Sequence, residues 1–195
     1  MPFNSPLKKL FRQTKNPGAK SDIARYMILE REGGLYVDMD FECIKNMSSC
    51  LIGSTFICGQ SPAGKENGEI EYINALLACT PNNKIIKKII ANLQSISKIN
   101  ETDAMNIINA TGPGLLTDVL NKSQKDETVG CTPSNYFYPW PSFMKHSDAN
   151  PKEYCEEYTY ALHHWGCSWF KHIPKSKVSI QRRIKNKIKM LLNLQ

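Results

Sequence analysis

The sequence lacks any apolar run of about 18 or more residues, the length that a membrane-spanning helix needs, and its N-terminus lacks the charged, apolar and small-residue order of a secretory signal. Its seven cysteines form no CxxC pair and no zinc-like spacing, which favours reduced, mostly buried thiols over a disulfide framework. Internal repeats and low-complexity segments are also missing. These absences predict a cytoplasmic protein.

Acidic residues are missing from the C-terminal end. From Lys171 onward there are eight Lys and Arg and no Asp or Glu, so the net charge of +7 resides in this tail. No motif that reads bases accompanies the charge, and we therefore expect no nucleic-acid partner. The spacing of apolar and basic residues predicts a basic amphipathic helix at 176–195, with Ile180, Ile184 and Ile188 on one face. Two interpretations remain open: peripheral contact with an anionic membrane surface, or docking on the body with a solvated basic face.

The remaining 175 residues have the composition of one globular domain. Residues 1–18, which carry several prolines and only a short possible helix around "LKKLFRQ", are predicted to be an irregular lead-in to a domain at 19–175. Hydrophobic periodicity predicts helices at 19–32, 71–80, 82–98 and 115–122, buried strands at 35–40, 54–60 and 128–131, and a loop at 133–144. Gly33-Gly34 and Pro81 would end the first two helices. Helices that alternate with short strands indicate an α/β sheet with helical layers.

Two carboxylates, Asp38 and Asp40, stand at the end of the first predicted strand, where ligands of α/β sheets collect. Residues i and i+2 of an extended segment point to the same side, so both acids, together with Tyr36, would share one face. Mg²⁺ and Mn²⁺ are commonly held by one or two carboxylates and by substrate phosphates. The pattern therefore fits a metal site, and it also fits ordinary solvated acids at a strand end.

Three segments carry a resemblance to a known family. The stretch "AKSDIARYMILEREGGLYVDMD" resembles the A-x-S-D-x-x-R-x-x-x-L-x-x-x-G-G-x-Y-x-D-x-D signature of the DxD-containing sugar transferases, glycosyltransferase family 32. Further along, "NATGPGLLT" is similar to the family's T-G-P segment and "ALHHWGCSW" to its late H-x-x-x-x-S-W segment. That family includes fungal initiating mannosyltransferases and capsular polysaccharide enzymes, and is related to the glucosylating toxins.

The resemblance implies a role for each matching residue. Asp22 would bond hydroxyls of the donor sugar, and Arg25 would lie at the sugar and diphosphate. Tyr36 would line the same pocket. Asp38 would reach the ribose, the sugar and the ion, and Asp40 would bind the metal directly.

Later motif positions complete the site that the resemblance implies. His163 would be a late metal ligand, with His164 as a rival that the sequence leaves open. The other pocket candidates are Asn74, Thr111, Gly112, Pro113, Ser168 and Trp169, of which Ser168 and Trp169 would close over the diphosphate. Without the motif order, the same residues read as a packed aromatic cluster, an ordinary turn and a polar helix position.

The resemblance implies a GT-A-like domain, a nucleotide-diphospho-sugar transferase, that moves a hexose from a UDP- or GDP-sugar to a glycan or lipid-linked acceptor hydroxyl. It implies Mn²⁺ or Mg²⁺ as cofactor and retention at the anomeric carbon, by a same-face mechanism or a double displacement. Such domains usually open with a strand and helix that hold the base, and residues 1–18 do not supply this unit. The alternative is therefore a catalytically incomplete binding or partner module of the same fold.

Overall fold

The computed structural model describes residues 6–63, 69–123 and 129–169. Its elements are, in chain order, α1 (Pro6–Gln13), α2 (Pro17–Glu32), β1 (Gly34–Val37), β2 (Phe41–Cys43), α3 (Ser48–Leu51), β3 (Phe56–Gln60), β4 (Tyr72–Cys79), α4 (Lys84–Ser95), α5 (Ala104–Ala110), α6 (Pro113–Asn121), β5 (Val129–Thr132) and β6 (Ala161–His163). Short 3-10 turns occupy Ser134–Tyr136, Ser142–Met144 and Pro151–Tyr154. The fold is mixed α/β, as the sequence predicts.

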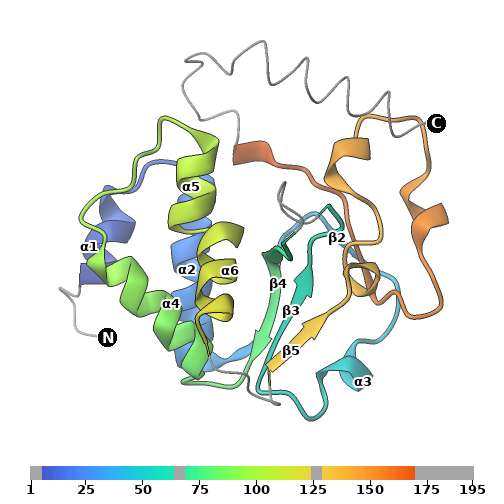
Figure 1. The fold of residues 1–195 in the computed structure, drawn as a ribbon, viewed down its shortest axis with the longest axis horizontal. Helices are drawn as coiled ribbons and strands as arrows, with labels where there is room; N and C mark the ends of the chain where they lie inside the picture. Colours follow the sequence, from blue (N-terminus) through green and yellow to red (C-terminus); the bar gives the residue numbers. More distant parts are fainter. Residues whose placement is uncertain (1–5, 64–68, 124–128, 170–195) are drawn as a thin grey trace.

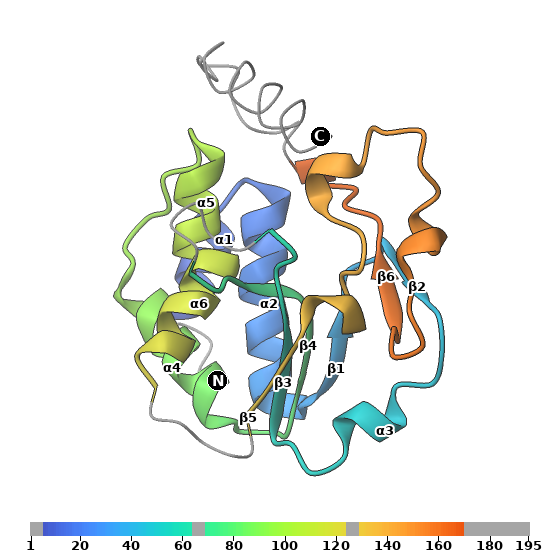
Figure 2. The same ribbon diagram turned by 45° about the vertical axis from the view of Figure 1, so that its right-hand side comes forward.

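A four-stranded sheet in the order β1-β4-β3-β5 forms the centre of the described chain. Strand β4 is antiparallel to both β1 and β3, and β5 runs parallel to β3. Helices α1, α2, α4, α5 and α6 lie on one side of this sheet, and the chain from β5 to β6 lies on the other (Figures 1 and 2). A second, two-stranded sheet pairs β2 with β6.

The central strands bury side chains on both faces, because successive residues of a strand point to opposite sides. On β4, Leu77 belongs to the core under the helices, whereas Leu76 belongs to the core on the opposite face. The second core is rich in aromatic side chains, with Phe137, Tyr138, Trp140 and Trp165 among its members. Strands β3 and β4 are therefore buried on both faces, and the segment after β5 packs against the second face.

Helix α2 has the boundaries that its sequence predicts to within two residues. Asn16 accepts hydrogen bonds from the amides of Gly18 and Ala19 and so satisfies the free N–H groups of the first turn. At the other end, Gly33 has a φ of 64° and its amide donates to the carbonyl of Leu29. A Cβ at Gly33 would lie 2.6 Å from Pro81 Cδ, so glycine is required there both by the backbone angle and by the neighbour.

The expected helix at 71–80 is wrong, because this segment forms β4 (Tyr72–Cys79). A continuous apolar run has no period of its own, and the strong helix formers Ala75, Leu76 and Leu77 are overridden by pairing with strands on both sides. The strands expected at 54–60 and 128–131 and the helices expected at 82–98 and 115–122 are confirmed by β3, β5, α4 and α6.

Three other expectations concern the ends of the chain and the first strand. In the segment expected to be an irregular lead-in, the short helix considered possible around "LKKLFRQ" is present as α1, which buries Leu7 and Leu10 in the helical core. The expected buried strand at 35–40 is shorter, since β1 ends at Val37 and is a half-exposed edge strand. The predicted basic helix at 176–195 lies outside the described residues. In the part of the chain that the structure covers, no helix has the length and apolarity to cross a bilayer.

Candidate functional site

Asp38 and Asp40 lie in the turn between β1 and β2 rather than on a strand, which corrects the expectation of an extended segment. The amide of Asp38 still donates to the Ala75 carbonyl at 2.8 Å, and the amide of Phe41 then donates back to the Asp38 carbonyl at 3.2 Å. The chain therefore reverses between the two acids, and Met39 between them is fully exposed. The turn, and not a pleat, brings the two carboxylates to one place.

His163 comes to the same place because β6 pairs with β2. In this ladder Phe41 is the partner of His163, and the residue before Phe41 is Asp40. The Nε2 atom of His163 lies 3.1 Å from Oδ1 of Asp40. One ligand atom from each of Asp38, Asp40 and His163 falls within 4.8 Å of the others. The structure thus joins residues that stand more than a hundred positions apart.

The turn after β6 holds Asp40 through a backbone amide that the sequence motifs did not single out. The Gly166 amide donates to Oδ2 of Asp40 at 2.5 Å, and the His164 amide donates to the Asp40 carbonyl at 2.9 Å. Trp165 and Cys167, on either side of Gly166, both have positive φ, at 54° and 46°. Burial acts to raise the pKa of Asp40, but hydrogen bonds from His163 and Gly166 lower it to about 2. The carboxylate is therefore ionised at neutral pH.

The two neighbouring histidines point to different partners. His163 is buried, and its ring stacks on Phe41 at a centroid distance of 4.6 Å and meets Trp165 at 4.3 Å. Its Nδ1 has no hydrogen-bond partner among the described residues, so ring packing fixes the orientation of the imidazole. His164 is exposed, and its Nε2 atom lies 3.2 Å from Oε2 of Glu42. The geometry therefore directs His163, and not His164, at the acidic pair.

Arg25 connects the acidic turn to helix α2. Its Nη2 lies 3.1 Å from Asp22 Oδ1 and 3.2 Å from Asp38 Oδ1, and its Nη1 donates to the Asn74 carbonyl. The guanidinium also lies over the ring of Tyr36, 4.4 Å from its centroid. Burial opposes the charge of Arg25, but Asp22 and Asp38 raise its pKa above the ordinary value. One buried cation therefore fixes both carboxylates.

Asp22 is buried, and both of its oxygens are occupied. Oδ1 accepts from Asn74 Nδ2 at 2.8 Å, and Oδ2 accepts from Thr111 Oγ1 at 2.8 Å. Asn74, expected on a helix, thus reaches Asp22 from strand β4 and also donates to the Tyr26 hydroxyl at 3.1 Å. Burial raises the pKa of Asp22, against the opposing effect of Arg25 and of these two hydrogen bonds.

The predicted loop Thr111-Gly112-Pro113 is the junction between α5 and α6. A Cβ at Gly112 would lie 3.5 Å from Asp22 Oδ2, an ordinary contact distance, so the loop packs directly against this carboxylate. Pro113 occupies the first turn of α6, where its missing amide hydrogen is not needed.

The Tyr36 hydroxyl completes the link between α2 and the acidic turn. It donates to Asp38 Oδ1 at 2.6 Å and lies 3.2 Å from Ser21 Oγ. Burial, together with the bond to Asp38, raises the pKa of Tyr36 to about 12, so the phenol keeps its proton. Ser21 was not predicted as a site residue, although it stands directly before Asp22 in the motif.

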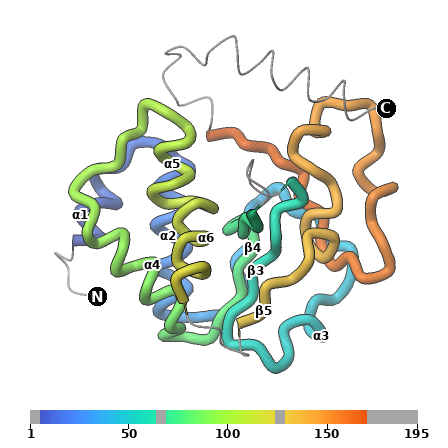
Figure 3. The backbone as a smooth tube through the Cα atoms, viewed as in Figure 1, coloured from blue at the N-terminus to red at the C-terminus, as the bar shows by residue number. Residues whose placement is uncertain are grey.

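Ser168 and Trp169 lie on the last described stretch, which runs from β6 toward the helical side (Figure 3). Trp169 packs on the start of α2, where a Cβ at Gly18 would lie 2.7 Å from the Trp169 ring. Its carbonyl accepts from Asn16 Nδ2 at 3.4 Å. Ser168 is exposed. The late motif is thus placed over the first turn of α2, the same helix that carries Asp22 and Arg25.

The acidic turn has the ligand set of a divalent-cation site. Adjacent ligands of an octahedral ion are about 3.0 Å apart and opposite ones about 4.2 Å apart when each bond is 2.0–2.1 Å. Asp40 Oδ1 and His163 Nε2 are 3.1 Å apart, which fits two adjacent ligands of an ion. All distances among the three ligand atoms of Asp38, Asp40 and His163 are within 4.8 Å, slightly more than the separation of two opposite ligands. Two carboxylates and one imidazole could therefore hold one ion after small side-chain movements.

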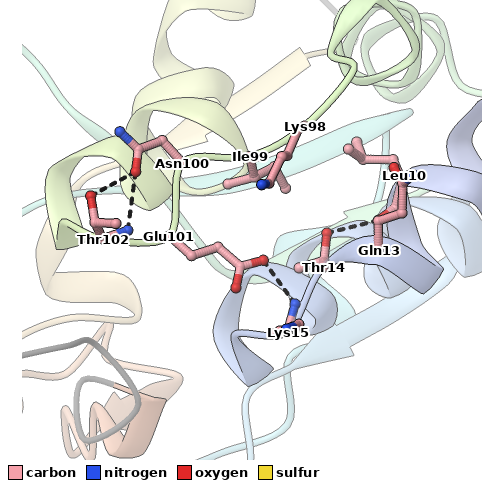
Figure 4. Close-up of a pocket in the computed structure, with 9 residues that line it drawn as sticks. All are labelled: Leu10, Gln13, Thr14, Lys15, Lys98, Ile99, Asn100, Glu101 and Thr102. Carbon is pink, nitrogen blue, oxygen red and sulfur yellow. Dashed lines mark hydrogen bonds between the residues drawn. The ribbon is translucent and has the colours of Figure 1, made fainter.

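A separate cavity of about 440 Å³ lies where the α1–α2 junction meets the segment 98–102 (Figure 4). Its lining residues are Leu10, Gln13, Thr14, Lys15, Lys98, Ile99, Asn100, Glu101 and Thr102. Both oxygens of Glu101 accept backbone amides, from Lys15 at 2.8 Å and from Asn16 at 3.0 Å. Glu101 thus holds the start of α2, and the cavity is distinct from the acidic turn.

The mixed α/β domain and its acidic turn have the features of DXD-containing sugar transferases, and comparison with known proteins confirms the resemblance. The sequence model of the family described as "Glycosyltransferase sugar-binding region containing DXD motif" matches residues 3–57. This range contains Asp22, Arg25, Tyr36 and both acids of the turn. The chain is therefore similar to the sugar transferases over the segment that carries the DXD motif, and the expected α/β fold class is confirmed by the structure.

Individual relatives agree with this assignment. The chain is 27% identical over 185 residues to the "Uncharacterized glycosyltransferase L373" of Acanthamoeba polyphaga mimivirus, covering 93% of this chain and 69% of the relative. It is 30% identical over 115 residues to the Saccharomyces cerevisiae "Mannosyl phosphorylinositol ceramide synthase CSH1", covering 59% of this chain and 28% of the relative. "Inositol phosphoceramide mannosyltransferase 1" of Schizosaccharomyces pombe is 33% identical over 98 residues, covering 50% and 29%. The chain spans less than a third of the length of the two fungal relatives.

Proposed function

We propose that the protein transfers a hexose, with mannose as the first candidate, from a nucleotide-diphosphate sugar (a UDP- or GDP-sugar) to an acceptor hydroxyl. The observation that carries this proposal is the cluster of Asp38, Asp40 and His163, tied through Arg25 to the buried carboxylate of Asp22. A nucleotide-sugar transferase needs a cation site for the diphosphate beside polar groups for the sugar. In this proposal, Asp38, Asp40 and His163 supply the cation site, and Asp22 supplies the polar group for the sugar.

Asp38, Asp40 and His163 are the ligands of the proposed divalent ion. Mn²⁺ accepts both carboxylate and imidazole ligands, whereas Mg²⁺ prefers oxygen alone, so this set favours Mn²⁺. When bound, the ion supplies Lewis-acid charge that stabilises the departing diphosphate. Gly166 and the stacked ring of Phe41 hold two of the ligands in place before the donor binds.

Asp22 is the proposed contact for hydroxyls of the donor sugar, as the family resemblance implies. Arg25, Asn74 and Thr111 contact its carboxylate and oppose the effect of burial on its pKa. Arg25 is engaged with its protein partners on both Nη atoms, so its proposed role is to position Asp22 and Asp38 and to add positive potential near the leaving group. Trp169 and Ser168, above the start of α2, are proposed to close over the diphosphate.

The acceptor is proposed to be a glycan or a lipid-linked hydroxyl. The fungal relatives carry mannosyl phosphorylinositol ceramide and inositol phosphoceramide in their names, which favours a phosphoinositol-bearing lipid as the first acceptor to try. The family resemblance further implies retention of configuration at the anomeric carbon. Peripheral membrane contact through residues 176–195 would suit such an acceptor.

The test incubates the full chain with Mn²⁺, a panel of UDP- and GDP-hexoses that includes GDP-mannose, and inositol phosphoceramide in detergent. We expect nucleotide release and a glycosylated lipid with one donor, both lost in Asp40→Asn. Glu42→Gln is the matched control, because Glu42 is a neighbouring carboxylate engaged with Lys152 and His164. Equal release by the parent and Asp40→Asn would refute the proposal. Absence of both turnover and nucleotide binding would favour a catalytically incomplete partner module instead.

A further inference from the structure

Two cysteines face each other across strands β3 and β5, on the opposite side of β4 from the edge strand β1 that leads into the acidic turn. Cys58 on β3 and Cys131 on β5 are direct partners in the parallel register. Partners in register on neighbouring strands point to the same face of the sheet. Both side chains accordingly lie on the helical face, where Cys58 is part of the core and Cys131 packs against it.

The distance between these thiols is close to sulfur–sulfur contact. Cys58 Sγ donates to Cys131 Sγ at 3.9 Å. Neighbouring strands are about 4.7–4.9 Å apart, which lies inside the 4.4–6.8 Å that separates Cα atoms across a disulfide. An S–S bond of about 2.05 Å therefore needs side-chain rotation and no movement of one strand relative to the other.

The two thiols differ in acidity and in access. The hydrogen bond from Cys58 lowers the pKa of Cys131, with a further contribution from Tyr72 and against the effect of burial. Burial raises the pKa of Cys58. Cys131 is half-buried on the edge strand, whereas Cys58 is fully buried. A small reagent therefore meets Cys131 first, and Cys58 stands behind it as a protonated neighbour.

Other cysteines have different surroundings. The thiol of Cys79 donates to the Leu29 carbonyl, that of Cys50 to the Met47 carbonyl and that of Cys43 to the Lys45 carbonyl. Cys58 instead donates its thiol hydrogen to the sulfur atom of Cys131. This arrangement places two oxidisable thiols at one point of the sheet.

We propose that Cys58 and Cys131 form a reversible oxidation site that closes to an intramolecular disulfide when the chain meets a peroxide. The Cys131 thiolate attacks one peroxide oxygen and the O–O bond breaks, which leaves a sulfenic acid on Cys131 and releases hydroxide that becomes water. The Cys58 sulfur then attacks the Cys131 sulfur and expels the hydroxyl, which leaves as water with the Cys58 proton. In sum, two thiols and one hydrogen peroxide give one disulfide and two waters.

Closure would link the edge strand covalently to its neighbour. Strand β5 pairs with β3 along one side and forms the end of the sheet. A bond between residues 58 and 131 would also close a long loop that contains β4, α4, α5 and α6. We therefore expect the oxidised chain to unfold at a higher temperature than the reduced chain.

The test treats the reduced full chain with equimolar hydrogen peroxide, alkylates the remaining thiols with iodoacetamide and maps the peptides by mass spectrometry. We expect a Cys58–Cys131 linked peptide, a loss of about 2 Da before alkylation, and full reversal by dithiothreitol. In Cys131→Ser the linked peptide must be absent, and in the control Cys43→Ser it must persist.

Three results would overturn the proposal. Cys58 and Cys131 could both be recovered as alkylated free thiols while Cys43 is oxidised. Cys131 could be found as a sulfinic acid with Cys58 unlinked. Cys131 could instead be found linked to other cysteines in mixed pairings. Each of these is measured on the parent chain and needs no variant to fold.

Discussion

Replacement of Thr111 by Val tests the buried network around Asp22. Thr111 is fully buried, and its hydroxyl donates to Asp22 Oδ2 at 2.8 Å. Valine has nearly the same shape and no hydroxyl, so the change removes the donor and leaves the packing almost unaltered. One oxygen of a buried carboxylate then has lost its partner.

The expected loss follows from the charge on the acceptor. A hydrogen bond to a charged group contributes about 1.5–3 kcal/mol, compared with about 0.5–1.5 kcal/mol for a neutral one. We expect Thr111→Val to reduce the free energy of unfolding by about 2 kcal/mol. For a chain of this size, about 1 kcal/mol shifts the melting temperature by about 2–4 °C, so the midpoint should fall by about 4–8 °C.

Thr14→Val is the matched control for urea and thermal unfolding monitored by circular dichroism. Thr14 is also buried, and its hydroxyl donates to the Leu10 carbonyl at 2.8 Å. In Thr14→Val the Leu10 carbonyl still accepts a hydrogen bond from the amide of residue 14, at 3.0 Å, so no group is left unpaired. The free energy of unfolding should therefore fall by about 1 kcal/mol or less. Equal losses for the two variants would refute the reasoning that Asp22 is a buried, ionised and hydrogen-bonded carboxylate.

Three further predictions concern single positions. Gly33→Ala should cost at least about 2 kcal/mol, because it combines a positive φ with a contact of 2.6 Å to Pro81, whereas Gly53→Ala, with φ 82° and open space, should cost only about 1 kcal/mol. Thermal midpoints compare the two, and similar shifts would contradict the steric explanation. Burial raises the pKa of Asp22, so the folded state holds its proton more tightly and the stability from this group falls as pH rises above the ordinary value of 3.8. The unfolding free energy of wild type minus that of Asp22→Asn should therefore decrease as the pH rises above about 4, and an increase would contradict it. Arg25→Lys should lower the free energy of unfolding, measured in urea, by about 2 kcal/mol, because one ammonium does not span the carboxylates of Asp22 and Asp38. An unchanged urea midpoint would refute the bridging role of Arg25.

Local signals predicted the elements whose ends are marked by specific residues. Helix α2 has an Asn cap before it and a glycine with positive φ after it, and both are readable in the sequence. Strand β4 was mistaken for a helix because its apolar residues face two cores at once, so the alternation that marks a half-buried strand is absent. What decides its conformation is pairing with strands that the local sequence does not describe.

The site was predictable as a set of residues but not as an arrangement. The motifs named Asp22, Arg25 and both acids of the turn, yet an extended strand was expected where the chain reverses at Met39. The proximity of His163 depends on the β2–β6 ladder, a pairing across 122 residues between Phe41 and His163. No spacing rule within one segment specifies that pairing.

Backbone groups were the least predictable part. Gly166 acts through its amide hydrogen, which every residue except proline carries, and the closeness of Asp40, 3.0 Å from where a Cβ would lie, is visible only in the structure. The position of Gly166 depends on two flanking residues with positive φ, Trp165 and Cys167, whose types do not favour that conformation. Ser21 was readable in principle, since it stands in the same motif as Asp22 and one helical turn before Arg25.

Direct measurement of Mn²⁺ binding tests the central claim that Asp38, Asp40 and His163 form one cation site beside the sugar pocket. Titration of the full chain with Mn²⁺ in the presence of GDP or UDP, followed by calorimetry and by the electron paramagnetic resonance signal of free Mn²⁺, gives affinity and stoichiometry. We expect one ion per chain, with at least about tenfold weaker binding in Asp40→Asn and in His163→Phe and unchanged binding in His164→Phe. Equal affinity for wild type, Asp40→Asn and His163→Phe would contradict this claim.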